Sequence, residues 1–259
     1  MPMSDTQAAH QGASDGPAGG DSVYRHRWPT RLWHWLNAAV LTVMLMSGLM
    51  IFNAHPRLYW GHYGANSDRA WLDLEHVRGG VPFPGWITLP SYYSLADARL
   101  WHLAFAWLLA GGLVAYLVWA FAGGHLRRDL APQLEELSPG HLWRDIRDHA
   151  RLRFPTGAAA LHYNVLQKLA YGAVLLLLLP GIVLTGLAMA PAIDAALPAL
   201  IDLLGGRQSA RSLHFLCASG LVAFFAVHIV MVLLAGPVNE LRSMLTGYYR
   251  LPSAREDRP

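Results

Sequence analysis

The sequence contains a single cysteine, Cys217, among its 259 residues. One cysteine cannot close an internal disulfide and cannot supply the four thiolates of an iron–sulfur cluster, so redox chemistry in this chain would need another carrier. The sequence also lacks a P-loop, a GxGxxG fingerprint that opens a helix after a strand, and a Ser/His/Asp constellation. No catalytic residue is therefore predicted.

Charged residues are scarce as well. They make up 14% of the chain, against about 25% in soluble globular domains. Hydrophobic types make up 54%, and the mean hydropathy is +0.26. This composition indicates a membrane protein. The formal net charge of +3 gives no indication of nucleic acid, and no nucleic-acid partner is expected.

The two ends of the sequence look different from its middle. Residues 1–22 are rich in Gly, Ala, Ser and Asp and contain no apolar core. They also lack the positively charged and apolar regions of a signal peptide. We therefore expect a disordered tail at 1–22, one membrane domain at 23–250, and a C-terminal tail at 251–259.

Four stretches are long and apolar enough to cross a bilayer as helices, which takes about 20 residues. They lie at about 30–53, 98–122, 165–189 and 212–235. A kink is expected at Pro180 and Gly181, and Gly236-Pro237 should end the fourth span. The predicted fold class is an all-α integral membrane protein with a four-transmembrane-helix bundle.

The distribution of basic residues predicts the orientation of these spans. Arginines and a lysine gather before the first span, between the second and third, and after the fourth, whereas the other two loops balance them with carboxylates. By the positive-inside rule, both termini and the second loop are cytoplasmic. The first outer loop, at about 54–96, is rich in Pro, Gly and aromatic residues. Either it packs on the outer leaflet, or it caps a cofactor and forms a docking surface for a partner.

Histidines in the spans are the strongest functional signal, because ionisable groups at membrane depth are costly. His214 and His228 are 228 − 214 = 14 residues apart in the fourth span, so they lie on nearly one helix face with a rise of about 21 Å. By depth, His102 pairs with His214 near the outer leaflet, and His34 pairs with His228 near the inner one. Such pairs can fill both axial positions of haem iron. The alternative is that each histidine only bonds a neighbouring helix.

Other residues near these histidines are candidates for haem or helix contacts. Arg31, Arg99 and Arg211 each lie three residues before one of the histidines, a spacing that suits propionate binding but also snorkelling to lipid headgroups. Small residues would let a flat macrocycle approach the backbone; they are Gly48, Gly111, Gly112 and Gly220.

Five stretches resemble one known family. They are RHRWPTRLWHWLNAAVLTVMLMSGLMIF (25–52), PRLYWGHYG (56–64), ARLWHLAFAWLL (98–109), HYNVLQKLAY with PGIVLTGLAMAP (162–191), and RSLHFLCASGLVAFFAVHIVMV (211–232). The sequence resembles the bacterial cytochrome b561 / nickel-hydrogenase cytochrome b superfamily. Within it, the thiosulfate reductase cytochrome b subunit-like proteins are the most similar branch.

The resemblance implies a multi-pass protein of the bacterial inner membrane with two haem b groups, and it carries the axial ligands onto His34, His102, His214 and His228. It also implies a quinone site and a periplasmic redox partner, in this branch usually a molybdopterin oxidoreductase. Several polar residues near the inner histidine pair are candidates to reach a quinone, or else they cap and anchor the third span; they are Asn37, His162, Tyr163, Asn164, Gln167 and Lys168.

The expected function is therefore that of a respiratory electron-transfer subunit between the quinone pool and a periplasmic oxidoreductase. Two alternatives stay open from the sequence. The first is a haem-free membrane anchor or transporter-like subunit, in which the histidines are structural or carry protons. The second is a cytochrome with a single haem.

Overall fold

The computed structural model describes residues 20–151 and 163–251. Within these residues, four helical segments are long and apolar enough to cross a membrane, which confirms the predicted fold class. They are α1 (Trp28–Asn53), α2 (Leu95–Ala122), a composite segment over Val165–Met189, and α8 (Arg207–Ala235). Three of them, α1, α2 and α8, begin two to five residues before the predicted span.

The composite third segment contains a change of helix type. It consists of α4 (Val165–Ala173), a π-helical turn η5 (Val174–Leu178) and α5 (Leu179–Met189). Pro180, in the first turn of α5, has no backbone N–H to donate to the preceding turn. The irregularity that the sequence placed at Pro180 and Gly181 therefore appears as a π-helical turn directly before the proline.

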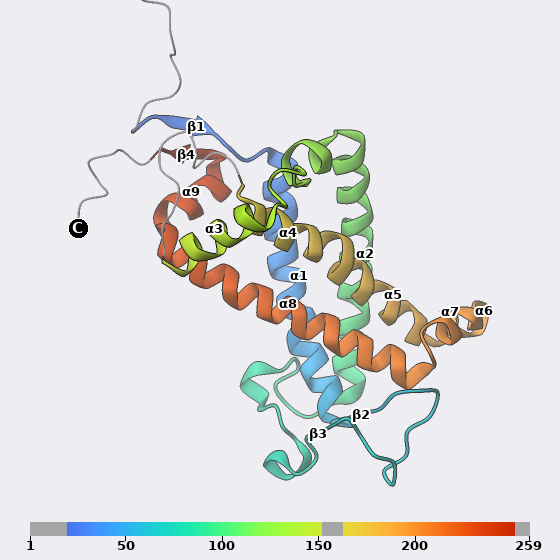
Figure 1. Cartoon of the computed structure of the whole chain (residues 1–259). Coiled ribbons are helices and arrows are strands. Elements are labelled where there is room, and N and C mark those ends of the chain that lie inside the picture. The colour runs from blue at the N-terminus through green and yellow to red at the C-terminus, as the bar shows by residue number, and fades with distance from the viewer. Residues whose placement is uncertain (1–19, 152–162, 252–259) are drawn as a thin grey trace, which may run out of the picture.

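The four segments form two closely packed helix pairs, α1 with α2 and α5 with α8. The pairs meet about midway along the helices in a cluster of buried apolar side chains: Val40, Met44, Leu109, Leu113, Leu179 and Ile182. Helix α8 crosses α1 obliquely (Figure 1). The buried residues of α8 are confined to its N-terminal end, at Ser209, Ala210 and Ser212. Further along α8, Cys217, Ala218 and Leu221 pack against the central cluster, and many of the remaining residues line a cavity between α8 and the α1–α2 pair.

One end of the bundle gathers both ends of the described chain (Figure 1). Strand β1 (Ser22–Tyr24) pairs antiparallel with β4 (Tyr248–Arg250). Beside them lie the π-helical η3 (Leu126–Leu130), α3 (Pro139–Ala150) and α9 (Pro237–Thr246). Two residues at the inner edges of the expected tails are ordered: Ser22 is in β1, and Leu251 is buried, with its N–H bonded to the carbonyl of Asp21. Residues 1–19 and 252–259 lie outside the described chain.

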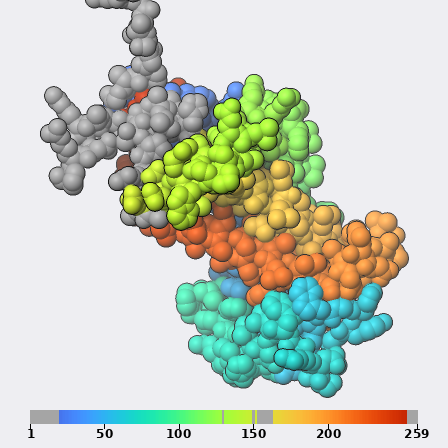
Figure 2. Space-filling model, viewed as in Figure 1, coloured from blue at the N-terminus to red at the C-terminus, as the bar shows by residue number. Residues whose placement is uncertain are grey.

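The opposite end carries the two loops that were expected to face outward. The first contains β2 (Arg57–Leu58), β3 (Leu72–Asp73), η1 (Val77–Gly80) and η2 (Gly85–Ile87), and the second contains α6 (Pro191–Ala196) and α7 (Pro198–Leu203). Strands β2 and β3 pair antiparallel. Figure 2 shows the first loop as a compact layer across this end of the molecule.

Hydrogen bonds fix this first loop to the start of α8. The Ser212 hydroxyl donates to the carbonyl of Tyr59 at 2.6 Å and accepts from the Trp71 indole at 2.9 Å. Ser209 Oγ accepts from the backbone N–H of Gly61 at 2.8 Å. The Asn53 side chain, at the end of α1, bonds both the N–H and the carbonyl of Phe83, at 3.0 and 2.8 Å. The loop is thus a folded cap, and the choice between leaflet packing and partner docking stays open.

Candidate cofactor site

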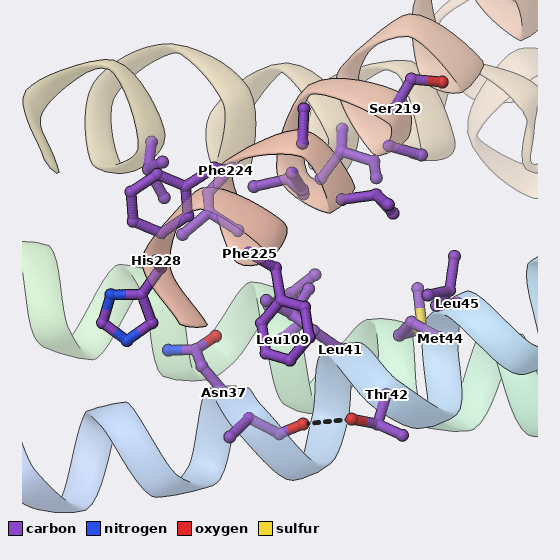
Figure 3. Close-up of a pocket in the computed structure, with 18 of the residues that line it drawn as sticks. Asn37, Leu41, Thr42, Met44, Leu45, Leu109, Ser219, Phe224, Phe225 and His228 are labelled. Atoms are coloured by element: carbon purple, nitrogen blue, oxygen red, sulfur yellow. Dashed lines mark hydrogen bonds between the residues drawn. The ribbon is translucent and has the colours of Figure 1, made fainter. Parts of the chain in front are cut away.

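A large cavity lies between the two helix pairs. Its volume is about 2540 Å³, whereas pockets for single ligands usually measure about 300–1,000 Å³. Its walls come from α1, α2, the composite third segment and α8, and they are mainly apolar. Figure 3 shows Phe224, Phe225 and His228 of α8 facing Leu41 and Asn37 of α1 across this space. The space can hold more than one ligand of ordinary size.

Two pairs of histidines face each other across the cavity. The ring centroids of His102 and His214 lie 6.1 Å apart with an interplanar angle of 61°, and those of His34 and His228 lie 6.2 Å apart at 60°. We call these the outer pair and the inner pair. Because an imidazole nitrogen sits about 2 Å from a bound metal ion, two rings on opposite sides of one iron have centroids about 6 Å apart. Both separations match that arrangement.

Hydroxyl groups bond both rings of the outer pair. Ser47 Oγ lies 3.0 Å from Nδ1 of His102, and Thr185 Oγ1 lies 3.0 Å from Nδ1 of His214. Sequence reasoning missed both hydroxyls. A signal was present, because each is followed by glycine and leucine in an apolar span, as Ser-Gly-Leu at 47–49 and Thr-Gly-Leu at 185–187.

The inner pair has a different environment. Nδ1 of His34 is buried and has no hydrogen-bond partner among the described residues. The His34 ring meets Trp35 edge to face at 5.0 Å, and the His228 ring stacks on Phe224 at 5.8 Å with an interplanar angle of 13°. These two rings are therefore oriented by aromatic neighbours.

The arginines predicted near the histidines take different positions. Arg99 and Arg211 line the cavity, and Arg211 also donates to the carbonyls of His55 and Arg57. Arg31 is not among the lining residues, and its Nε donates to the carbonyl of Met244 at 3.3 Å. Arg31, which was expected near the inner end of the cavity, therefore points toward α9 instead.

Arg25, which was not predicted as a site residue, lines the inner end of the cavity instead. It pairs with Glu240 at 3.4 Å, and its guanidinium carbon lies 4.5 Å from the centroid of the Tyr249 ring. Its Nε is buried without a hydrogen-bond partner in the described part of the chain. Next to it, burial and the Arg25 charge lower the pKa of His26 to about 4, so this ring is neutral at pH 7.

The polar residues predicted near a quinone are partly used for helix capping. Asn37, Tyr163, Asn164 and Gln167 line the cavity. Asn164 and Gln167 also form a capping box at the start of α4, so the capping interpretation applies to both. His162 lies outside the described residues.

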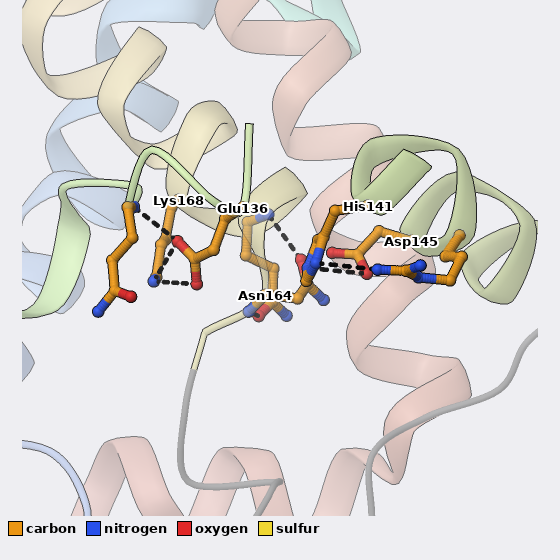
Figure 4. Close-up of polar contacts among 8 residues, drawn as sticks. Glu136, His141, Asp145, Asn164 and Lys168 are labelled. Carbon is orange, nitrogen blue, oxygen red and sulfur yellow. Dashed lines mark hydrogen bonds and ion pairs between the residues drawn. The ribbon is translucent and has the colours of Figure 1, made fainter. Parts of the chain in front are cut away.

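Lys168, the last of these candidates, is committed to an ion pair. Its Nζ contacts Oε1 and Oε2 of Glu136 at 2.7 and 2.8 Å, and it is not among the residues that line the cavity (Figure 4). The hydrogen bond from Lys168 holds the pKa of the Glu136 carboxyl below its usual range.

The small residues differ from one another in what they face. A Cβ on Gly48 would lie 3.4 Å from Cε1 of His102, so this glycine does adjoin the site. Gly112 faces Trp33 and Gly220 faces Leu178, so both serve contacts between helices. Nothing lies within 4 Å of a Cβ on Gly111. Gly186, not predicted, is the counterpart of Gly48, with 3.3 Å to Cε1 of His214.

Comparison with known protein families identifies the family to which this chain belongs. The family model described as prokaryotic cytochrome b561 matches residues 25–247. The chain belongs to the prokaryotic cytochrome b561 family. It is therefore a b-type cytochrome, which implies haem b and electron transfer, and its four apolar helices make it a multi-pass protein of the bacterial inner membrane.

Alignments with curated relatives cover most of the cytochrome sequence. It is 32% identical over 220 residues to the "Putative protein-methionine-sulfoxide reductase subunit YedZ1" of Azospira oryzae, covering 84% of this chain and 93% of that protein. It is 27% identical to the "Probable Ni/Fe-hydrogenase B-type cytochrome subunit" of Azotobacter vinelandii, covering 92% and 91%. The protein of the same name from Cupriavidus necator is 23% identical, covering 95% and 94%. No solved structure matches the chain significantly.

The residues of the cavity fit haem on three counts. In each histidine pair, the ring centroids are separated by a distance that suits one iron bound between the two rings. Gly48 and Gly186 leave room for the edges of the His102 and His214 rings against α1 and α5. The walls are apolar, with arginines near both ends. Ligation of iron by these four histidines stays a prediction.

Proposed function

We propose that this cytochrome holds two haem b groups, one between His102 and His214 and the other between His34 and His228. We further propose that it passes electrons between the quinone pool and a periplasmic, molybdopterin-dependent oxidoreductase. One observation carries the proposal: two histidine pairs with ring separations of 6.1 and 6.2 Å lie at opposite ends of one apolar cavity.

The protein chain would set the position of each haem and exclude water from the space between the two sites. Haem b would supply a one-electron iron couple, and His102 with His214, and His34 with His228, would hold its iron in a way that suits electron transfer rather than oxygen binding. His214 and His228 share α8, and their 14-residue spacing gives a rise of about 21 Å. One helix thus sets the depth of both sites, and the apolar cluster around Met44 and Leu179 keeps water from the space between them.

Asn37 supports a quinone site at the inner end. Its Nδ2 donates to the carbonyl of Trp33 at 3.0 Å, while its buried Oδ1 has no partner among the described residues. A buried acceptor without a donor is costly, and a quinol hydroxyl is a donor of the matching kind. Asn37 follows His34 by three residues, so both lie on one side of α1. Tyr163 and Gln167 line the same end of the cavity.

The cap over the outer end supports a partner site there. The Arg57 ion pairs with Asp73 and Glu75, at 2.9 and 2.5 Å, hold its hairpin together. Tyr63 and Trp86 are largely exposed, at 89% and 81%. A folded, aromatic cap near the outer histidine pair is a suitable surface for a redox subunit, and one relative is named as a reductase subunit.

The haem stoichiometry of the purified protein tests the cofactor part of the proposal. We expect a b-type reduced spectrum and two haems per chain by the pyridine haemochrome method. His102→Ala and His228→Ala should each remove one haem, and the matched control His76→Ala, at an exposed loop position, should keep both. Absence of a b-type band would favour the haem-free anchor or transporter, and one haem per chain would favour the single-haem cytochrome.

Purification of the tagged cytochrome from its native membrane under mild detergent tests the partner. We expect a co-purifying subunit that contains molybdopterin, detected by the fluorescence of its oxidised pterin. Added quinol should reduce the haem, and the substrate of that partner should then reoxidise it. Recovery of a nickel–iron hydrogenase instead would overturn the molybdopterin part of the proposal while leaving the haem assignment intact.

A further inference from the structure

The outer histidine pair is held by two hydroxyl groups whose own protons are already used. Ser47 Oγ donates to the carbonyl of Val43 at 2.7 Å, one helical turn back on α1. Thr185 Oγ1 donates in the same way to the carbonyl of Gly181 at 2.7 Å on α5. A hydroxyl has a single proton and two lone pairs, so each oxygen is left as an acceptor toward the histidine.

This arrangement fixes the tautomer of both rings. Because the hydroxyl accepts, the proton of the neutral imidazole of His102 resides on Nδ1, and the same holds for His214. Nε2 of each ring then carries the lone pair. The two rings approach each other across the cavity with centroids 6.1 Å apart. This is the centroid separation expected when one nitrogen of each ring binds the same iron.

The same local unit occurs twice. Ser47 is followed by Gly48, and Thr185 is followed by Gly186, and in both cases a Cβ on the glycine would press on Cε1 of the histidine, at 3.4 and 3.3 Å. The glycine lets the edge of the ring lie against the helix, and the hydroxyl fixes its rotation. Two different helices, α1 and α5, thus present the same hydroxyl–glycine surface to the histidine of the helix packed beside them.

Among the residues that the structure describes, the inner pair has no such unit. His34 Nδ1 lacks a hydrogen-bond partner in the described chain, and the His228 ring stacks on Phe224 of its own helix. The two sites therefore differ in the electronic state of their imidazoles. An acceptor on the Nδ1 proton makes the imidazole a stronger donor through Nε2, and a stronger donor favours ferric over ferrous iron.

We propose that Ser47 and Thr185 are positioning residues of the outer haem site, which select the Nε2-ligating tautomer of His102 and His214 and lower the reduction potential of that site relative to the inner one. The proposal rests on the assignment of these two histidines as a ligand pair. It deepens that assignment by naming what orients the ligands and by distinguishing the two sites.

Redox titration of the visible spectrum tests this in the detergent-purified cytochrome with its haems bound. Ser47→Ala and Thr185→Val each remove one acceptor, and we expect the lower of the two midpoint potentials to rise while the other stays. A tenfold change in the ferric-to-ferrous preference corresponds to about 59 mV for one electron. Outer-shell substitutions of this kind weaken metal binding about 10- to 100-fold, so haem should also be lost more readily from this site.

Two further variants separate positioning from general damage. Thr185→Ser keeps the hydroxyl and should restore the parent potential. Thr246→Val removes a hydroxyl that makes the same bond to its own helix, to the carbonyl of Arg242 at 2.8 Å, but does not line the cavity and bonds no histidine within the described residues, and it should leave both potentials in place. The low-spin ferric EPR signal of one site should change in Ser47→Ala, because the His102 ring is freed to rotate.

The outcomes distinguish this proposal from the haem assignment. If His102→Ala and His214→Ala each retain two haems, the ligand assignment itself is wrong. If they each lose one haem but Ser47→Ala and Thr185→Val leave potential, haem retention and EPR signal as in the parent, only the positioning role is overturned. A potential that shifts equally in Thr246→Val would overturn it as well.

Discussion

Replacing Gly186 with alanine should weaken haem binding at the outer site. The new Cβ would stand 3.3 Å from Cε1 of His214, whereas carbon contacts are most favourable at about 3.5–4.0 Å. His214 must then move by a few tenths of an ångström, away from the position that Thr185 fixes. Overpacking of this kind costs about 1–3 kcal/mol, and this cost falls on the haem-bound state, in which His214 must keep its position; the helical preference of alanine over glycine is the same with and without haem and cancels.

A loss of about 1–3 kcal/mol corresponds to a haem dissociation constant raised roughly 5- to 150-fold. Titration of haem into the apo-protein in detergent measures it. Gly111→Ala is the matched control, because it is exposed, has nothing within 4 Å of its Cβ, and is not among the cavity-lining residues. It should bind haem as the parent does. If Gly186→Ala binds as tightly as Gly111→Ala, the close approach of His214 to α5 does not constrain the site.

Three other substitutions probe the inner end and the two bundle ends. Asn37→Leu should raise the KM for quinol about 10-fold, as loss of a buried hydrogen bond worth about 1–3 kcal/mol predicts, with haem content unchanged; an unaltered KM would exclude Asn37 from the quinone site. The carboxylate of Glu136 has a lowered pKa, so its contribution to stability is present above the ordinary value of 4.5 and is lost as the pH falls through the lowered pKa. Glu136→Gln should therefore cost up to about 1 kcal/mol at pH 7 and reduce acid sensitivity, read from the thermal midpoint at pH 7 and pH 4. Asn53→Ala leaves the backbone of Phe83 unpaired and should cost about 1–3 kcal/mol, seen as faster proteolysis of the 54–96 loop; equal rates would show that the cap does not depend on Asn53.

Much of the fold could be predicted because its signals are local. An apolar stretch reveals a span without knowledge of its neighbours, and the 14-residue spacing of His214 and His228 gives their relative depth on one helix. The direction in which each span runs then pairs His102 with His214 and His34 with His228. The structure brings the four rings together in those pairs.

What could not be predicted depends on how one helix faces another. The hydroxyl of Thr185 reaches His214 only because α5 packs against α8 in one particular register. Arg25 meets Glu240, 215 positions away, because β1 pairs with β4. Strands of three residues carry almost no pattern of their own, so this pairing, and with it the replacement of Arg31 by Arg25 at the cavity, was not visible in the sequence.

The division of the bundle into two helix pairs has a consequence for assembly. Helices α1 and α2 contribute His34 and His102, while α8 contributes both of their partners, so each iron would bind one nitrogen from either half of the molecule. The helices of the two halves pack together around the central apolar cluster, and the cap over α8 and the β1–β4 pairing join the halves at the two ends. Delivery of the prosthetic groups would therefore complete the tertiary structure, and a cell starved of them would accumulate inserted but loosely joined helical hairpins for its membrane proteases to remove.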